Sequence, residues 1–138
     1  MRPSTAACRV ALFVGASLSA YDQVERAPYA PRCAPPWASV VLDVEGAVAG
    51  TQFDRFGALW LGEVPLLRLT TPEPEHATEP TRWRVERDVT ALGPLFLASA
   101  EAALAVPNVV DETYTGPINL TATLSFYPPP PPPPPPPT

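Results

Sequence analysis

An acid and a base stand side by side in "QFDRFGALWLG", the stretch from Gln52 to Gly62. The stretch is mostly apolar and reads as a strand, in which successive side chains point to opposite faces of a sheet. If Phe53 and Arg55 point to one face, Asp54 points to the other. It would then share the apolar side with Phe56. A partly buried carboxylate there either pairs with Arg55 or caps a turn, or it is an acid that takes part in chemistry.

Other catalytic side chains are scarce. The one histidine, His76, lies in "TPEPEHATEP", a proline-rich acidic loop in which a solvated histidine is expected rather than a catalytic base. The two cysteines, Cys8 and Cys33, show no CxxC spacing, which argues against a zinc site. They either form one disulfide or, if a signal peptidase removes Cys8, leave Cys33 unpaired. We therefore expect neither a metal nor another cofactor.

Length and composition favour one folded domain with a tail. The chain has 138 residues, of which 46% are hydrophobic and 17% charged, so a packed core is possible. The net charge of −5 argues against nucleic acid or an anionic membrane as the main partner. Nothing in the sequence matches a GxGxxG or a phosphate-binding loop.

Proline dominates the C-terminus, where Pro128 to Pro137 form one run. Such a run adopts polyproline II, and at about 3.1 Å per residue it spans roughly 31 Å. We interpret residues 128–138 as a solvated linker or tail. A ligand for proline-binding modules is the alternative, but no flanking Arg or Lys sets a binding register. Because the chain stops one residue after the run, we expect it to be a fragment of a longer protein.

The first 20 residues have two interpretations, a signal peptide or a first strand. Arg2 and Arg9 precede "VALFVGASLSA", and the small Ser17 and Ser19 suit a signal peptidase site. The apolar run is too short to span a bilayer. The triplet "NLT" at 119–121 is an acceptor pattern for N-glycosylation. Together these features favour a secreted protein or one of the secretory pathway, without a membrane partner.

Alternation of apolar and polar residues indicates several short strands. It is found in "SVVLDVEGAVAG" and "TRWRVERDVT". "FGALWLGEVPLLRLT" reads as two strands joined near Gly62 and Glu63. In "INLTATLSFY", Thr121, Thr123, Ser125 and Tyr127 should point outwards. "ALGPLFLASAEAALAV" predicts a short turn of helix and then a strand through 102–106. The residues expected inside an antiparallel sandwich are Val40, Leu42, Val44, Leu59, Leu61, Val85, Leu120, Leu124 and Phe126.

Five blocks in order resemble one family. They are "QFDR", the "WLG" at 60–62, Arg68 with "EP" at 73–74, Trp83 with "DVT" at 88–90, and "NVVDETYTG" at 108–116. The blocks are similar to the N-terminal domain of the peptide-N4-(N-acetyl-β-glucosaminyl)asparagine amidase A family, the plant and fungal peptide N-glycanases. The resemblance covers residues 21–127 and extends to "YAPRCAPPW" before the first long strand.

The resemblance implies an all-β fold, an antiparallel β-sandwich of jelly-roll type, followed here by the polyproline II tail. It also implies hydrolysis of the amide that joins an asparagine side chain to the first N-acetylglucosamine of an N-glycosylated peptide or protein. Asp54 matches an essential aspartate in a W-D-R element of bacterial peptide N-glycanases, and Asp111 is the nearest match to a second carboxylate. Arg55, Trp60 and Glu112 are the expected substrate-binding residues.

The full family has a second sandwich domain, which this chain lacks, so the resemblance implies half of an active site. Two other hypotheses stay open: a glycan-binding or structural sandwich without catalysis, and a wall or matrix protein in which the proline rod carries the function. On the structural interpretation, Asp54 caps a turn and Asp111 holds the "DETYTG" turn. A core position is the alternative for Trp60, and Arg68 and Trp83 are expected to be structural.

Overall fold

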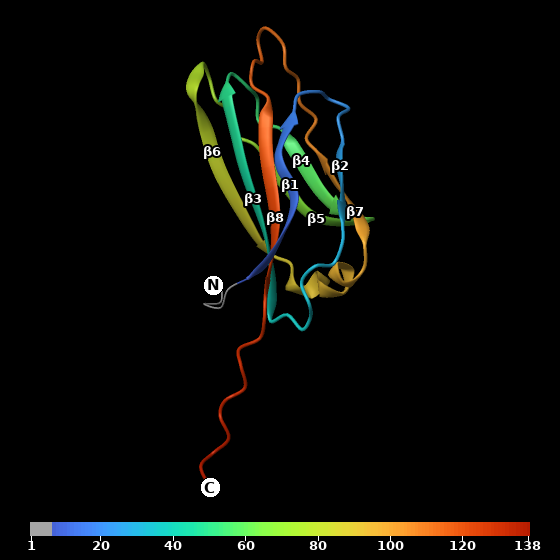
Figure 1. Cartoon of the computed structure of the whole chain (residues 1–138). Helices are drawn as coiled ribbons and strands as arrows, with labels where there is room; N and C mark the ends of the chain where they lie inside the picture. Colours follow the sequence, from blue (N-terminus) through green and yellow to red (C-terminus); the bar gives the residue numbers. More distant parts are fainter. Residues whose placement is uncertain (1–6) are drawn as a thin grey trace.

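The computed structural model describes residues 7–138, and two four-stranded antiparallel sheets make up the fold (Figure 1). The first sheet has the strand order β1-β8-β3-β6, and the second sheet has the order β2-β7-β4-β5. The elements are β1 (Cys8–Leu18), β2 (Glu25–Tyr29), β3 (Ser39–Gly50), β4 (Phe56–Leu61), β5 (Val64–Thr70), β6 (Ala77–Asp88), the 3-10 helix η1 (Thr90–Leu97), β7 (Ala100–Ala105) and β8 (Ile118–Tyr127). The predicted antiparallel β-sandwich is therefore confirmed.

The core lies between the two sheets and consists of alternate residues of their strands. Leu42 and Leu124 of the first sheet and Leu59 of the second are fully buried. All of the predicted inner residues are buried except Val85, which is half-buried against the core. Val85 lies on β6, an edge strand that pairs only with β3, so fewer side chains of the opposite sheet cover it.

The alternation in β8 is wrong at its C-terminal end, because Ser125 and Tyr127 are buried as well. Ser125 lies between Arg9 of β1 and Val41 of β3 in the middle of the sheet, where larger neighbours cover its small side chain. At the end of the strand, the Tyr127 carbonyl accepts a 2.8 Å hydrogen bond from the Ala38 amide, which brings the 30–38 segment against β8. Burial there comes from the connection and not from the strand pattern.

The predicted short helical turn is η1, at the end of the sandwich where β6 finishes. Asp88, the last residue of β6, contacts the first residue of η1: its Oδ1 accepts hydrogen bonds from the Thr90 hydroxyl (2.5 Å) and the Thr90 amide (2.9 Å). These bonds favour the charged form and hold the pKa of Asp88 below its usual value. The Thr90 hydroxyl also accepts from the Val40 amide at 2.9 Å. The "DVT" block is therefore a structural joint between η1 and β3.

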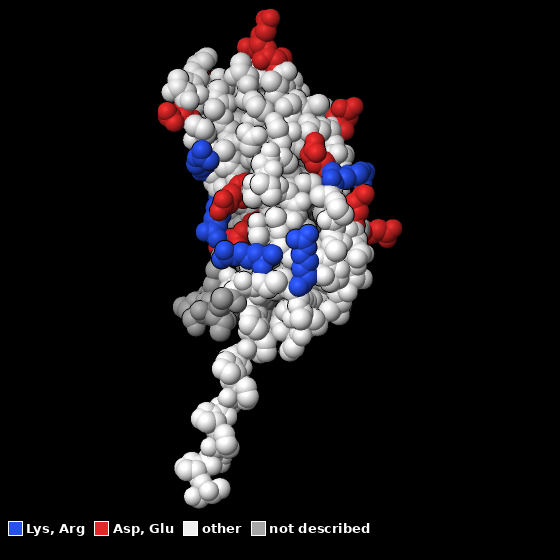
Figure 2. Space-filling view, viewed as in Figure 1, with Lys and Arg blue, Asp and Glu red and all other residues white. Residues whose placement is uncertain are grey.

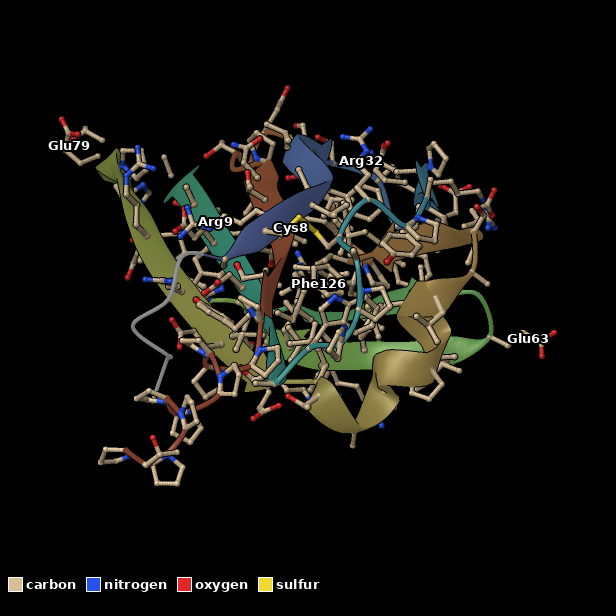
Figure 3. All side chains as sticks on the ribbon, turned by 60° about the horizontal axis from the view of Figure 1, so that its bottom comes forward. Cys8, Arg9, Arg32, Glu63, Glu79 and Phe126 are labelled. Atoms are coloured by element: carbon tan, nitrogen blue, oxygen red, sulfur yellow. A yellow bond between two sulfur atoms is a disulfide. The ribbon has the colours of Figure 1, made fainter. Side chains whose placement is uncertain are left out.

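Residues 8–18 form strand β1 in the first sheet, and a disulfide joins Cys8 to Cys33 (Figure 3). The bridge ties β1 to the segment between β2 and β3. In the same figure, Phe126 lies between the sheets, where its ring is 4.8 Å from that of Trp37. Residues 128–138 are exposed and lie outside both sheets. Within residues 7–138, no helix is long and apolar enough to cross a bilayer.

Replacing Leu124 by aspartate is expected to unfold the domain, because it places an unpaired charge in the fully buried centre of β8. The matched control is Asn119→Asp on the exposed face of the same strand, which should shift the free energy of unfolding by only about 0.5 kcal/mol. Thermal unfolding followed by circular dichroism measures both. A Leu124→Asp protein that melts like the parent would show that the register is wrong.

Candidate functional site

Three loops meet at one end of the sandwich, opposite η1 (Figure 1). They are 51–55 between β3 and β4, 71–76 between β5 and β6, and 106–117 between β7 and β8. The antiparallel order brings them together, because β3, β5 and β7 all finish at this end. Three of the five sequence blocks, "QFDR", "EP" and "NVVDETYTG", lie in these loops. Figure 2 shows acidic side chains at the tip of this end.

Backbone hydrogen bonds join the three loops. The Gln52 amide donates to the Pro74 carbonyl (3.0 Å), and the Thr115 amide donates to the Thr51 carbonyl (3.0 Å). Gly116 packs so closely against Ala49 that an added Cβ would collide with the Ala49 carbonyl oxygen. The loops therefore form one braced unit in which the position of each depends on the others.

The Gln52 side chain is the buried centre of this unit, only 3% exposed. Its Nε2 donates to the carbonyl oxygens of Val109 and Gly116, both at 2.9 Å. Its Oε1 accepts from Arg55 Nη2 at 2.6 Å and from Arg55 Nε at 3.2 Å. One neutral amide thus holds the 106–117 loop with its donor end and a guanidinium with its acceptor end. The sequence analysis missed this role, although Gln52 belongs to the "QFDR" block.

Two aromatic rings that contact each other lie next to the guanidinium of Arg55. Its guanidinium carbon lies 5.6 Å from the ring centres of both Phe53 and Tyr114, and these rings lie 4.8 Å apart. The Arg55 amide also donates to Thr71 Oγ1 at 2.8 Å. Within residues 7–138, no carboxylate forms an ion pair with Arg55. Because the Gln52 side-chain oxygen is neutral, it orients the guanidinium without a negative charge that would offset the positive one.

Asp54 lies next to Arg55 in this loop, and the structure corrects its expected burial. The 52–55 segment precedes β4 and is not part of a strand, so strict alternation does not apply to it. Asp54 is exposed, and Phe56, which was expected on the apolar side, is 78% exposed. The Asp54 amide donates a long hydrogen bond to Glu73 Oε1 at 3.4 Å. In the described part of the chain, its carboxylate neither caps a turn nor pairs with Arg55.

Asp111 lies in the neighbouring loop and holds a turn. Its Oδ1 accepts hydrogen bonds from the amides of Thr113 (2.8 Å) and Tyr114 (2.7 Å), and its own amide donates to the Tyr114 carbonyl (2.8 Å). The turn places the Tyr114 ring beside Arg55, which links Asp111 to the site. Glu112 is exposed at the tip of the same turn. The structure thus brings Asp54, Arg55, Asp111 and Glu112 to one end of the sandwich.

Trp60 lies apart from these residues. It is 39% exposed on the outer face of β4 and near the opposite end of that strand, so the alternative of a core position is wrong. Its expected role in substrate binding stays a prediction. Trp60 lies four positions after Phe56, a distance of about 13 Å along a strand. Phe56 itself follows the site and lines a shallow apolar hollow of about 260 Å³ with Leu69 and Pro107. Because Phe56 is an exposed aromatic residue beside the site, it is a candidate for contact with a ligand, which the sequence pattern did not reveal.

The arrangement offers an exposed carboxylate beside an oriented cation. A carboxylate can take a proton from water, and a guanidinium can donate hydrogen bonds to an oxygen that gains negative charge. Arg68 is exposed on β5, and Trp83 covers Gly46 of β3 so closely that an added Cβ would overlap its ring. No group of three metal-ligating side chains is found among the described residues.

Comparison with known proteins agrees with the five blocks. The sequence pattern of the family described as peptide N-acetyl-β-D-glucosaminyl asparaginase amidase A matches residues 2–130. The peptide-N4-(N-acetyl-β-glucosaminyl)asparagine amidase A of Prunus dulcis is 35% identical over 92 residues, which cover 67% of this chain and 16% of that protein. A solved structure of the Tobacco streak virus coat protein is 12% identical with a TM-score of 0.42, covering 98% of this chain and 95% of that chain. The chain therefore belongs to the peptide N-glycanase A (amidase A) family.

Proposed function

We propose that this chain is the N-terminal sandwich domain of a peptide N-glycanase, which hydrolyses the amide between asparagine and the first N-acetylglucosamine of an N-glycoprotein. The observation that carries the proposal is the braced loop unit in which the exposed Asp54 stands beside Arg55. Membership of the family and the position of the "QFDR" block support it. The strand order, in which the chain passes repeatedly from one sheet to the other, supports a jelly-roll topology.

In the proposed reaction, Asp54 accepts a proton from the water that attacks the side-chain amide carbonyl carbon. The bond between that carbonyl carbon and the amide nitrogen then breaks, asparagine becomes aspartate, and the glycosylamine, still bonded to the sugar, leaves after its nitrogen gains a proton. Arg55, the next residue of the loop, donates hydrogen bonds to a substrate carbonyl oxygen in this proposal. Charge on that oxygen grows in the transition state, so a fixed cation stabilises the transition state more than the substrate.

Gln52 has a positioning role in this proposal. A carboxylate in its place would orient Arg55 equally well but would cancel much of its charge. The neutral amide keeps the positive charge for substrate, while the ring pair of Phe53 and Tyr114 packs against the guanidinium. Asp111, whose turn presents Tyr114, contributes through the same contact. Glu112 and Phe56 are proposed to contact the peptide or the sugar at the rim.

The site is proposed to need a second sandwich domain. The chain spans 16% of the length of its Prunus dulcis relative. The described loops supply one oriented cation and one free carboxylate near it, whereas amide hydrolysis also needs help for the leaving nitrogen. The carboxylates at Asp111 and Glu112 lie at the tip, where a neighbouring domain can complete the site.

The experiment compares the 138-residue chain with a chimera in which residues 7–127 replace the matching stretch of the Prunus dulcis amidase A. Mass spectrometry of a denatured glycopeptide follows the conversion of asparagine to aspartate. The chimera is expected to release the glycan, and the chain alone is not. Robust turnover by the chain alone would refute the half-site. A folded chimera without turnover would refute the catalytic proposal.

A non-catalytic glycan-binding or structural sandwich is the second candidate, and the geometry of Asp111 favours it. Both of its amide contacts belong to the turn, as expected of a structural residue. Binding of the glycopeptide by the chimera without hydrolysis would support this candidate. For localisation we propose the secretory pathway, because the disulfide between Cys8 and Cys33 is typical of an oxidising compartment.

A further inference from the structure

The acceptor triplet "NLT" lies on the outer face of the first sheet, a surface that the proposed reaction does not use. Asn119 is the second residue of β8 and is exposed, whereas its neighbours Ile118 and Leu120 point into the core. The chain has two asparagines, and they differ in exposure to solvent. Asn108 is fully buried, and its Nδ2 donates to the Leu18 carbonyl at 2.9 Å. Asn119 is therefore the one asparagine whose side chain can carry a large group in the folded domain.

Small residues surround Asn119 on both sides. Across the sheet it pairs with Ser17 of β1 and with Ala47 of β3, the residues whose side chains lie nearest to its own. Thr121, the third residue of the triplet, is next on the same face and accepts a hydrogen bond from the Gly15 amide at 2.9 Å. Thr121 also lines, together with Thr123, a shallow polar hollow of about 220 Å³ on this face. The face offers a first sugar both space and hydrogen-bonding groups.

The disulfide supplies an independent argument about the compartment. The bridge between Cys8 and Cys33 joins β1 to the 30–38 segment, and structural disulfides form in the oxidising secretory compartments in which N-glycans are attached. The acceptor triplet and the disulfide thus require the same compartment. Neither observation depends on the catalytic proposal.

We propose that Asn119 carries an N-linked glycan. Asn119 Nδ2 forms the bond to C1 of the first N-acetylglucosamine of a lipid diphosphate oligosaccharide. The bond between C1 and the diphosphate breaks, and the displaced lipid diphosphate leaves with the amide proton. The glycan covers the outer face of the first sheet. It leaves the second sheet free for a neighbouring domain.

The test is expression of the full chain behind a cleavable secretion leader in a eukaryotic host, followed by peptide mapping after endoglycosidase treatment. The expected product carries one N-acetylglucosamine stub on Asn119. Asn119→Gln and Thr121→Ala should both abolish the stub, and Thr121→Ser, which retains the acceptor pattern, should keep it. The glycosylated chain and Asn119→Gln are expected to melt within about 3 °C of each other, since a change on an exposed face has little effect on stability.

The matched control moves the acceptor pattern to the buried asparagine. Val110→Thr in the Asn119→Gln background creates the pattern at Asn108, where a glycan cannot be accommodated in the fold. This variant is expected to be retained in the cell or to melt far below the parent. The proposal is overturned if secreted, disulfide-linked chain carries an unmodified Asn119. A glycan on Asn119 that lowers the melting midpoint as strongly as one on Asn108 would overturn the argument that the outer face of the first sheet accommodates it.

Discussion

Asp54→Asn in the chimera with the Prunus dulcis amidase A is expected to lower the rate of glycan release by about 100-fold or more, the usual contribution of a positioned acid or base. The substitution keeps the shape of the side chain and removes its charge. Asp54 is exposed, and its side chain makes no hydrogen bond to another described residue, so its loss should not affect folding. The measurement is the asparagine-to-aspartate mass shift of a glycopeptide under single-turnover conditions.

The control is Glu63→Gln, at the turn between β4 and β5 at the opposite end of the sandwich (Figure 3). It removes the same unit of charge from an exposed site and should leave turnover unchanged. Thermal melting of both variants should match the parent. Normal turnover by Asp54→Asn would show that Asp54 is only an exposed loop residue without a catalytic role. The proposed mechanism would then lose its general base.

The second large effect is expected at Gln52. Gln52→Ala removes the acceptor that orients Arg55 and the donor that holds the 106–117 loop. We expect kcat/KM to fall by about 100-fold, the scale of a small misplacement of a reacting group. The free energy of unfolding should also fall, by about 1–3 kcal/mol, because the Val109 carbonyl loses its donor and the Gly116 carbonyl keeps only the longer bond from Asn108. Gln52→Glu should lower kcat/KM as well, since a carboxylate would neutralise Arg55.

Asn108→Ala separates positioning from stability. Asn108 is the other buried amide of this loop unit: it donates to the same Gly116 carbonyl at 3.3 Å and makes no hydrogen bond to Arg55. It should cost comparable stability and leave kcat/KM nearly unchanged at a temperature well below melting. In the isolated domain, the Nε–H signal of Arg55 in an NMR spectrum should broaden or shift in Gln52→Ala and not in Asn108→Ala. Equal loss of activity in both variants would make Gln52 a structural residue only.

The strands were predictable because alternation is a local property. In β8, Leu120 and Leu124 face the core, and Thr121 and Thr123 face outwards, as a period of two requires. The short helix and the turn at Gly62 were equally local signals. Alternation was wrong where other segments decide burial, as at Tyr127. It also failed at Asp54, which lies in a loop before β4 where no sheet fixes the direction of successive side chains.

The sequence by itself determined the family and the two-sheet class, through five ordered blocks and the spacing of apolar residues. It also marked Asp54, Arg55 and Asp111 as candidates. Only the tertiary structure decided which blocks share a site, because three of them meet where β3, β5 and β7 end, while "DVT" joins η1 to β3. It placed Trp60 elsewhere and revealed the role of Gln52. That role rests on hydrogen bonds to Val109 and Gly116, residues more than 50 positions away, which no local pattern encodes.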